Sequence, residues 1–351
     1  MTQHSMTSLD RVLTTLGHCE PDRVPLFLLL SLHGAKELGV STQTYFSKPD
    51  LVAEGQLRLR NKIGHDCLYS FFYAAVEVEA WGGEVIHVDN GPPNSGMPFI
   101  RKMDQIDSLE PPSVTDTPCL YKVLEATRTM KDAVGTDAPI IGVVMSPFSL
   151  PVMQMGFGPY LDLMHEQPDR FNRLMAVNTA FCVEWANAQL AAGATAICYF
   201  DPVSSTTIIP ADLYRKTGKI IATQTISRIQ GPVATHMASG SCLNIVDDIH
   251  QTGTAVIGVS AMENLRDMKA ACRGKLTVLG NLNGLEMIDW TEKEAISAVR
   301  KAIGHAGPGG GFILSDNHGE IPWQVSETVL MAVSHAVHEY GQYPVRQMGI
   351  D

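Results

Sequence analysis

The sequence lacks both long hydrophobic runs and clusters of basic residues. Its longest apolar stretch, Val24 to Leu32, is far shorter than the roughly 20 residues that a membrane-spanning helix needs. Basic residues number 26 against 37 acidic ones, the net charge is −11, and no run of five basic residues occurs. Nucleic acids and anionic membrane surfaces bind through clustered Lys and Arg. We therefore expect neither of them as the main partner, and we expect no signal peptide.

The seven cysteines show no pairing pattern. Their number is odd, they are scattered along the chain, and no CxxC motif occurs. This pattern is typical of reduced intracellular thiols rather than of a disulfide framework. We therefore expect a cytoplasmic protein.

The composition predicts a folded globular protein, because 45% of the residues are hydrophobic and only 18% are charged. A length of 351 residues leaves one large α/β domain or two smaller ones open. No Gly/Ser-rich linker divides the chain, and the proline-rich segment from Pro92 to Pro118 is predicted to be a surface insertion. The chain is therefore predicted to form one domain, residues 1–351.

Short β-rich segments alternate with helical patterns along the chain. They are Arg23 to Leu30, Cys67 to Tyr73, Ala138 to Ser146, Ala194 to Asp201, Pro232 to Met237, Thr254 to Val259, Lys275 to Asn281 and Gly311 to Asp316. Eight is the number of strands in a (β/α)8 barrel, so we predict an α/β barrel of the TIM type with an N-terminal helical arm, residues 1–22.

The clearest βα unit lies near the middle of the chain. After Pro168, apolar residues recur at steps of three and four, which predicts a helix that ends near Gly193. The segment from Ala194 to Phe200 follows at once and is almost entirely apolar, as expected for a parallel strand that is covered on both faces.

Three catalytic motifs are missing. The first strand is followed by Ser31 to Ala35 rather than by the GxGxxG turn of a dinucleotide-binding sheet. No GxSxG motif occurs, and no lysine stands at a predicted strand end. Acyl transfer through a serine elbow and Schiff-base chemistry therefore have no candidates.

Polar residues stand instead at the predicted strand ends. They are Glu77 and Glu79 after the second strand, Asp201 after the fourth, His236 after the fifth, Asn281 and Asn283 after the seventh, and Asp316, Asn317, His318 and Glu320 after the eighth. The C-terminal ends of barrel strands form the active site of such folds. Carboxylates and amides together suit the fused amide and amine edge of a heterocycle, because the carboxylate accepts from N–H groups while Asn both donates and accepts.

Each of these residues also has a purely structural interpretation. Glu77 and Glu79 face one side of a strand or begin a helix as solvated charges. Asp201 precedes a proline and suits a helix N-cap or an Asx-turn. Asn281 suits bonding to neighbouring backbone, and a single histidine such as His236 is usually a satisfied core or loop residue. The sequence leaves these alternatives open.

Five segments together resemble the uroporphyrinogen decarboxylase superfamily, which also contains cobalamin-dependent methyltransferases. They are Asp22 to Pro25, Val76 to Gly82, Phe200 to Ser205, Gly280 to Asn283 and Asn317 to Gly319. The resemblance covers nearly the whole chain and implies the same barrel.

Departures from the family pattern separate its branches. The decarboxylases carry two arginines after the first strand to hold substrate carboxylates, whereas Leu29 to Ala35 contains none. The thiol-methylating branch builds a zinc site from HxC after the fifth strand and a Cys after the eighth. Here Ala238 and His318 stand at those positions, so the resemblance implies an acceptor other than a thiol and no metal.

We therefore predict an enzyme, a corrinoid-dependent methyltransferase. It moves a methyl group from methylcobalamin, or a related methylcorrinoid bound by a partner corrinoid protein, to N5 of tetrahydrofolate. The residues expected to bind the pterin are Asp201, Asn281, Asn283 and Asp316. The residues expected to handle the N5 proton are His318, His236, Glu77 and Glu79. A homodimer is left open.

Three rival interpretations remain at this point. One is a zinc-dependent methylcobalamin:thiol methyltransferase of the coenzyme M type, with a rebuilt metal site of His236, His318 and Glu320 near Cys242. Another is a uroporphyrinogen decarboxylase. The third is a corrinoid-binding or pterin-binding module without catalysis.

Overall fold

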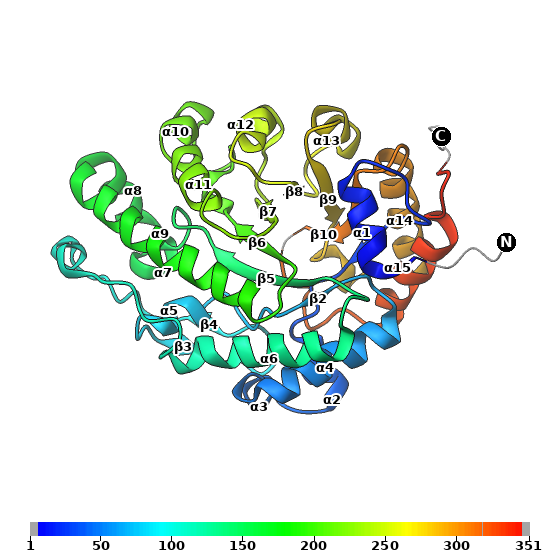
Figure 1. Cartoon of the computed structure of the whole chain (residues 1–351), viewed down its shortest axis with the longest axis horizontal. Helices are drawn as coiled ribbons and strands as arrows, with labels where there is room; N and C mark the ends of the chain where they lie inside the picture. The colour runs from blue at the N-terminus through cyan, green and yellow to red at the C-terminus, as the bar shows by residue number, and fades with distance from the viewer. Residues whose placement is uncertain (1–5, 318, 346–351) are drawn as a thin grey trace.

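The computed structural model describes residues 6–317 and 319–345, and eight strands of this part form one parallel sheet (Figure 1). The strands are β1 (Leu26–Phe27), β2 (Leu68–Tyr69), β5 (Ile140–Met145), β6 (Ala196–Phe200), β7 (Val233–His236), β8 (Val256–Gly258), β9 (Thr277–Leu282) and β10 (Phe312–Asp316). Each overlaps one predicted segment, so the predicted barrel fold is confirmed. That residues 1–351 form a single domain stays a prediction.

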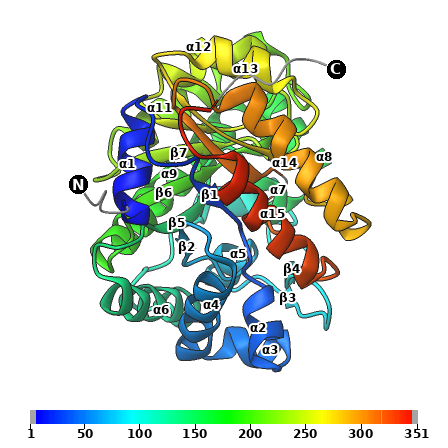
Figure 2. The same ribbon diagram turned by 90° about the vertical axis from the view of Figure 1, so that its right-hand side faces the viewer.

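Helices surround the strands in both views (Figures 1 and 2). They are α1 (Ser8–Leu16), α2 (His33–Leu38), α3 (Thr42–Ser47), α4 (Pro49–Ile63), α5 (Val76–Ala80), α6 (Pro118–Val134), α7 (Pro151–Met155), α8 (Phe157–Glu166), α9 (Pro168–Ala191), α10 (Ala211–Lys216), α11 (Gly218–Ile226), α12 (Val246–His250), α13 (Leu265–Cys272), α14 (Glu292–Ala306) and α15 (Glu327–Tyr340). Short 3-10 turns are η1 (Met103–Ser108), η2 (Pro202–Ser204), η3 (Leu243–Ile245) and η4 (Glu286–Ile288), and β3 (Val85–Ile86) pairs with β4 (Asn94–Ser95) in a small hairpin. Within the described part, no helix is both long and apolar enough to cross a membrane.

The strands bury both of their faces, which explains their nearly continuous apolar sequences. On β6, Ile197 and Tyr199 pack outward in one cluster with Phe181 and Trp185 of α9. Cys198 points the opposite way, because successive side chains of a strand alternate between faces. It belongs to an interior cluster made of Val12, Phe27, Cys67, Tyr69, Ile141, Cys198, Val256, Leu279 and Ile313.

The N-terminal arm closes the end of the barrel at which the strands begin. Val12 of α1 packs into the interior cluster. The backbone N–H of Leu9 donates to the carbonyl of Asp137 before β5, and the hydroxyl of Thr277 at the start of β9 donates to the carbonyl of Thr15. The opposite end, where the strands finish, is therefore the end that remains for a site.

The first and last strands of the sheet order, β1 and β2, meet through Asp66. Its N–H donates to the Leu26 carbonyl at 2.7 Å, and its Oδ2 accepts from the Leu26 N–H at 2.8 Å. The backbone and the carboxylate of one residue thus join two strands that are each only two residues long. Asp66 therefore closes the barrel at this seam.

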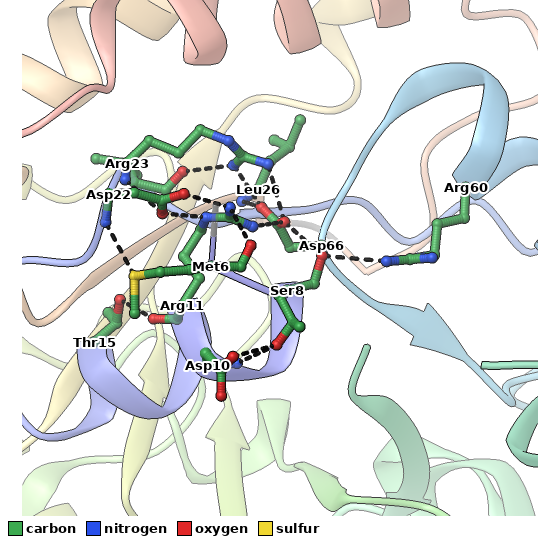
Figure 3. A network of polar contacts seen from close by, with 12 residues as sticks. Met6, Ser8, Asp10, Arg11, Thr15, Asp22, Arg23, Leu26, Arg60 and Asp66 are labelled. Carbon is green, nitrogen blue, oxygen red and sulfur yellow. Dashed lines mark hydrogen bonds and ion pairs between the residues drawn. The ribbon is translucent and has the colours of Figure 1, made fainter. Parts of the chain in front are cut away.

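The buried Asp66 carboxylate also holds the N-terminal arm (Figure 3). It accepts from Arg11 Nη1 at 2.7 Å and from Arg23 Nη1 at 2.6 Å, and Arg11 makes two further hydrogen bonds to Asp22. Burial alone would raise the pKa of Asp66, but the two guanidinium groups and the Leu26 amide outweigh burial and lower it. The charge is therefore retained inside the protein and ties α1, β1 and β2 together.

Replacement of Asp66 by Asn should be strongly destabilising. The change removes one buried charge, leaves Arg23 without an ion-pair partner among the described residues and leaves Arg11 with Asp22 alone, and breaking a buried ion pair typically costs about 3–5 kcal/mol. Urea unfolding should show this loss for Asp66→Asn, whereas Glu54→Gln, which breaks an exposed pair with Arg58, should change stability by less than about 1 kcal/mol. Equal stability of Asp66→Asn and wild type would show that the seam does not depend on this charge.

Candidate active site

A cavity of about 210 Å³ lies where the strands end. Aromatic and aliphatic side chains form most of its wall, and a few polar groups converge on it, which is the usual make-up of a ligand site. Its lining consists of Leu29, Tyr69, Phe71, Ala74, Pro92, Pro93, Asn94, Val143, Met145, Cys198, Phe200, His236, Ser315, Asp316, Gly319 and Glu320.

The β3–β4 hairpin contributes Pro92, Pro93 and Asn94 to this wall. The hairpin is tied to the rest of the mouth by two hydrogen bonds, from the Thr42 hydroxyl to the Val88 carbonyl (3.0 Å) and from Gln324 to the Asn90 carbonyl (3.4 Å). The segment from Pro92 to Pro118, predicted to be a surface insertion, thus contributes its first residues to the cavity wall. Proline-rich composition marked the loop, but it did not indicate that the loop folds back over the strand ends.

Two carboxyl groups face the cavity from the end of β10. Asp316 Oδ1 accepts from the Leu29 N–H at 3.3 Å, and burial raises the pKa of Asp316 to about 7. Glu320 Oε1 accepts from the Ser31 hydroxyl and from the Leu32 N–H. Burial, aided by the negative charge of Asp316, raises the pKa of Glu320 to about 8.

These two groups titrate as a neighbouring pair near neutral pH, so the pair both donates and accepts hydrogen bonds there. In the described part of the chain, the Glu320 hydrogen bonds go only to Oε1. Glu320 also lines the cavity. A pair of carboxyls with pKa values close to 7 suits proton transfer to or from a bound molecule.

His236 ends β7 and forms another side of the cavity. Its Nδ1 accepts from the backbone N–H of Ala238 at 3.0 Å, so the neutral ring carries its proton on Nε2. The ring stacks on Phe200, with 5.5 Å between centroids. Gly258 on the adjacent strand leaves space for it, because a Cβ there would lie 2.4 Å from His236 Cδ2. The ring of His236 is therefore held in one orientation at the cavity wall.

Cys198 lies in the cavity wall, and burial raises its thiol pKa to about 12. It is therefore an uncharged thiol at neutral pH and a poor metal ligand. Among residues 6–317 and 319–345, no group of three or more His, Cys, Asp or Glu side chains is placed to hold a metal ion. His318, expected to handle a proton or to bind metal, lies outside the described residues.

Asp201 is buried behind the cavity and does not line it. Its Oδ1 accepts from the hydroxyls of Ser146 (2.5 Å) and Ser149 (2.7 Å), and its N–H donates to the His236 carbonyl (2.8 Å). Burial raises its pKa, against the opposing effect of the serine hydroxyls. Asp201 thus joins the ends of β5, β6 and β7, and its predicted contact with a pterin is not made through the cavity wall.

Glu77 and Glu79 belong to the short helix α5 rather than to a strand. Glu77 is buried, and its Oε1 accepts from the Met145 N–H at 2.8 Å. Glu79 accepts from the Tyr73 hydroxyl at 2.6 Å. Neither lines the cavity. Glu77 instead holds the end of β5, whose Met145 is part of the wall.

Asn281 and Asn283 line a second cavity, of about 490 Å³, beside α13 and α14. The Asn281 amide donates to the carbonyls of Ser260 (2.9 Å) and Glu263 (3.3 Å). Asn283 Oδ1 accepts from the backbone N–H groups of Leu285 and Glu286. The structure thus separates these amides from Asp316 and His236, with which they were expected to share a site.

The sequence interpretation missed Ser31, Tyr69, Phe71 and Phe200 as parts of the site, and it gave Glu320 no role outside a metal site. Tyr69 and Phe200 stand at the ends of β2 and β6, so the strand-end rule applied to aromatic residues would have found them. Ser31 carried no such signal, because its role depends on contact with a residue 289 positions away.

Glu77→Gln tests the burial of an ionisable group at this site. Burial raises the pKa of Glu77 from 4.5 to about 8, although the Met145 amide and Trp185 favour its charged form. The folded protein therefore holds a proton that the unfolded chain releases, and stability falls as pH rises between these values. Gln keeps an oxygen that accepts from the Met145 N–H. The decrease of the free energy of unfolding with pH should therefore become smaller by about 1.4 kcal/mol per pH unit between about pH 5 and 7.5.

Urea unfolding at several pH values measures this slope. Glu110→Gln, at an exposed position paired with Arg173, should leave it unchanged. A slope of wild-type size in Glu77→Gln would show that Glu77 is ionised in the folded protein.

Comparison with known proteins places the chain among two kinds of enzyme. It is 26% identical over 301 residues to a uroporphyrinogen decarboxylase of Solibacter usitatus, a match that covers 84% of this chain and 85% of the relative. It is 23% identical over 315 residues to the methylcobamide:CoM methyltransferase MtaA of Methanosarcina barkeri, covering 86% and 91%. A solved methyltransferase from Methanosarcina mazei shares the fold, with a TM-score of 0.85 at 21% identity over 95% of this chain and 99% of that one. Because residues 7–340 match the uroporphyrinogen decarboxylase (URO-D) family, the chain belongs to that family.

Proposed function

We propose that this protein transfers a methyl group from a methylcorrinoid, carried by a partner protein, to N5 of tetrahydrofolate. The observation that carries this proposal is the pairing of Leu29, Ser31 and Leu32 with Asp316 and Glu320. In the decarboxylase pattern, the segment after the first strand, here Leu29 to Ala35, supplies arginines that bind a substrate with several carboxylates. Here it binds two acids, and the described residues of the cavity wall include no Lys or Arg. A multiply anionic substrate would meet repulsion instead of ion pairs.

A thiol acceptor activated by zinc is also a poor fit to the residues present. The position of the first expected cysteine is Ala238, whose N–H occupies His236 Nδ1. His318 stands at the position of the second expected cysteine. Cys198 keeps its proton at neutral pH because burial raises its pKa to about 12. This donor set does not suit a zinc–thiolate site, so the proposal includes no step through a metal.

An amine acceptor suits the cavity better. The N5 lone pair of tetrahydrofolate forms the new N–C bond, the cobalt–carbon bond breaks with its electron pair left on cobalt, and the N5 proton leaves to a base. We assign the base to Glu320, which lines the cavity and has a pKa raised to about 8. Asp316 accepts from N–H groups of the pterin edge, and His236 donates from Nε2. The proton-accepting role thus moves from His236 to Glu320, because His236 Nδ1 already accepts a hydrogen bond.

The rim of the mouth supports docking of a protein that carries the methyl group. Among the described residues, most of the exposed large apolar side chains stand on segments that lead from a strand end to the next helix. They are Ile86, Val88, Met97, Ile208, Leu243, Met262, Leu285 and Ile288. Apolar side chains exposed around the mouth of a barrel are available for contact with a partner protein. A partner seated on this rim would bring its corrinoid over the cavity, where alignment of the reacting atoms supplies much of the rate.

The acceptor is tested by mixing the protein with methylcobalamin and either tetrahydrofolate or coenzyme M. We expect the methylcobalamin spectrum to be lost and methyltetrahydrofolate to form, with no reaction of the thiol. Metal analysis of the same preparation tests the rival interpretation, a zinc-dependent thiol methyltransferase. Turnover with the thiol alone, together with stoichiometric zinc, would refute the proposed acceptor, and binding of both ligands without turnover would refute catalysis.

Glu320→Gln should lower kcat by about 10²–10³-fold, the usual effect of removing a general base. Glu320 must be ionised to accept the proton, and its pKa is raised to about 8. Wild-type kcat should therefore rise with pH up to about 8, and the variant should lack this rise. Glu327→Gln, which removes an exposed partner of Lys62, is the matched control. An unchanged pH profile in Glu320→Gln would assign the base to another residue.

A further inference from the structure

The second cavity is a groove on the other side of β9 from the first. At one end it is lined by Asn281 and Asn283, at the end of the strand. From there it follows α14, which lies next to α13 (Figure 1), and reaches Lys301 and His305. Ala298, Lys301 and His305 lie on one face of that helix and span about 10 Å at 1.5 Å per residue. The groove is therefore elongated and suits a chain rather than a compact ring.

The far end of the groove is positively charged. His305 and Lys301 line it, and Arg266 stands at the start of α13. Burial lowers the pKa of His305, and the nearby charges of Arg266 and Lys301 lower it further, so the positive charge at this end comes from Lys301 and Arg266, and His305 is a neutral hydrogen-bonding group. None of the three makes an ion pair with a described acidic side chain, in a protein of net charge −11. Within residues 6–317 and 319–345, these side chains therefore have no acidic partner.

Two acids also line the groove, and neither neutralises this end. Glu263 Oε1 accepts from the backbone N–H groups of Cys242 (2.9 Å) and Leu243 (2.7 Å), and Oε2 accepts from the Cys242 thiol (3.3 Å). Its carboxylate is thus already bound to three donors. Glu286 belongs to η4 near the strand end and is exposed to solvent.

The near end of the groove adjoins the first cavity. Leu282, which lines the groove, pairs with Asp316 across β9 and β10. Neighbouring strands lie about 4.8 Å apart, so the strand ends that line the two cavities are next to each other. Trp290 and Met262, whose side chain is 81% exposed, supply flat and flexible apolar surface beside the amides. An aromatic ring fits between such groups.

We propose that this groove binds an extended carboxylate-bearing chain, held by Lys301, His305 and Arg266. The proposal rests on the proposed function, in which the acceptor carries such a chain. Tetrahydrofolate joins its pterin through an aminobenzoyl ring to one or more glutamyl residues. The pterin occupies the first cavity, the aryl ring crosses to Trp290 and Met262, and the glutamyl carboxylates reach the basic end. A free acidic peptide presents the same row of carboxylates as the glutamyl chain, so it is the second possible ligand of this groove.

The test uses calorimetric titration of the full chain at low salt with three ligands: tetrahydrofolate with one glutamate, tetrahydrofolate with three, and free tri-γ-glutamate. We expect the triglutamyl form to bind about tenfold tighter than the monoglutamyl form, equivalent to 1.4 kcal/mol, as two partly exposed charge pairs provide. Lys301→Ala and Arg266→Ala should each reduce the affinity ratio of the triglutamyl to the monoglutamyl form about threefold. Lys293→Ala, at an exposed position on α14 that does not line the groove, should keep it.

The outcomes separate this proposal from the proposed function. Turnover of the monoglutamyl form, with equal affinity for both forms, would overturn the groove assignment and leave the function standing. Binding of free tri-γ-glutamate that Lys301→Ala abolishes, without turnover of either folate, would support the carboxylate site and refute the folate acceptor. A tenfold preference that survives in both variants would overturn the assignment to these residues. Thermal unfolding of each variant verifies that it is folded.

Discussion

The seam at Asp66 is the constraint on which the rest of the structure depends. A barrel needs its first two strands to meet, and here each has only two residues, so little ladder bonding is available. The Asp66 carboxylate replaces that bonding and stays charged because Arg11 and Arg23 lie against it. Since β1 leads directly into Leu29 to Leu32, the same seam also fixes the backbone groups that bind Asp316 and Glu320.

The pKa values of Asp66, at the closed end of the barrel, and of Asp316 and Glu320, at the open end, are shifted in opposite directions. At the closed end, guanidinium groups lower the pKa of Asp66, and the charge contributes to stability. At the open end, the hydrogen-bond partners that the structure describes for Asp316 and Glu320 are backbone amides and a hydroxyl, and burial raises the pKa values of these two groups to about 7 and about 8. Ionising them costs stability, which is the usual condition of groups retained for chemistry. Glu77 and Asp201 also have raised pKa values but do not line the cavity, so it is the combination of a raised pKa with a place in the cavity wall that marks Asp316 and Glu320 as functional candidates.

The sequence predicted the fold well because buried parallel strands leave a simple signal, short apolar segments separated by helical periodicity. The sequence predicted which residues lie at the strand ends, but not which cavity or neighbour their side chains face. Asp316 and Asn281 both stand at strand ends, yet one faces the first cavity and the other the groove beside α14. Glu77 was placed near the mouth, but its five-residue helix turns it towards the Met145 amide. Such directions depend on contacts between residues far apart in sequence, which periodicity does not report.

The mouth of the barrel therefore presents three surfaces of different chemistry. The exposed apolar rim suits a protein surface, the cavity with two acids suits an amine, and the basic groove suits carboxylates. One small acceptor would need only the cavity, and a protein carrier alone would need only the rim. All three are accounted for together when the proposed acceptor has a basic ring nitrogen at one end and an anionic chain at the other. The strand end shared by Leu282 and Asp316 is where the two parts of such a molecule would join, so the separation of Asn281 from Asp316 fits one long ligand rather than two unrelated sites.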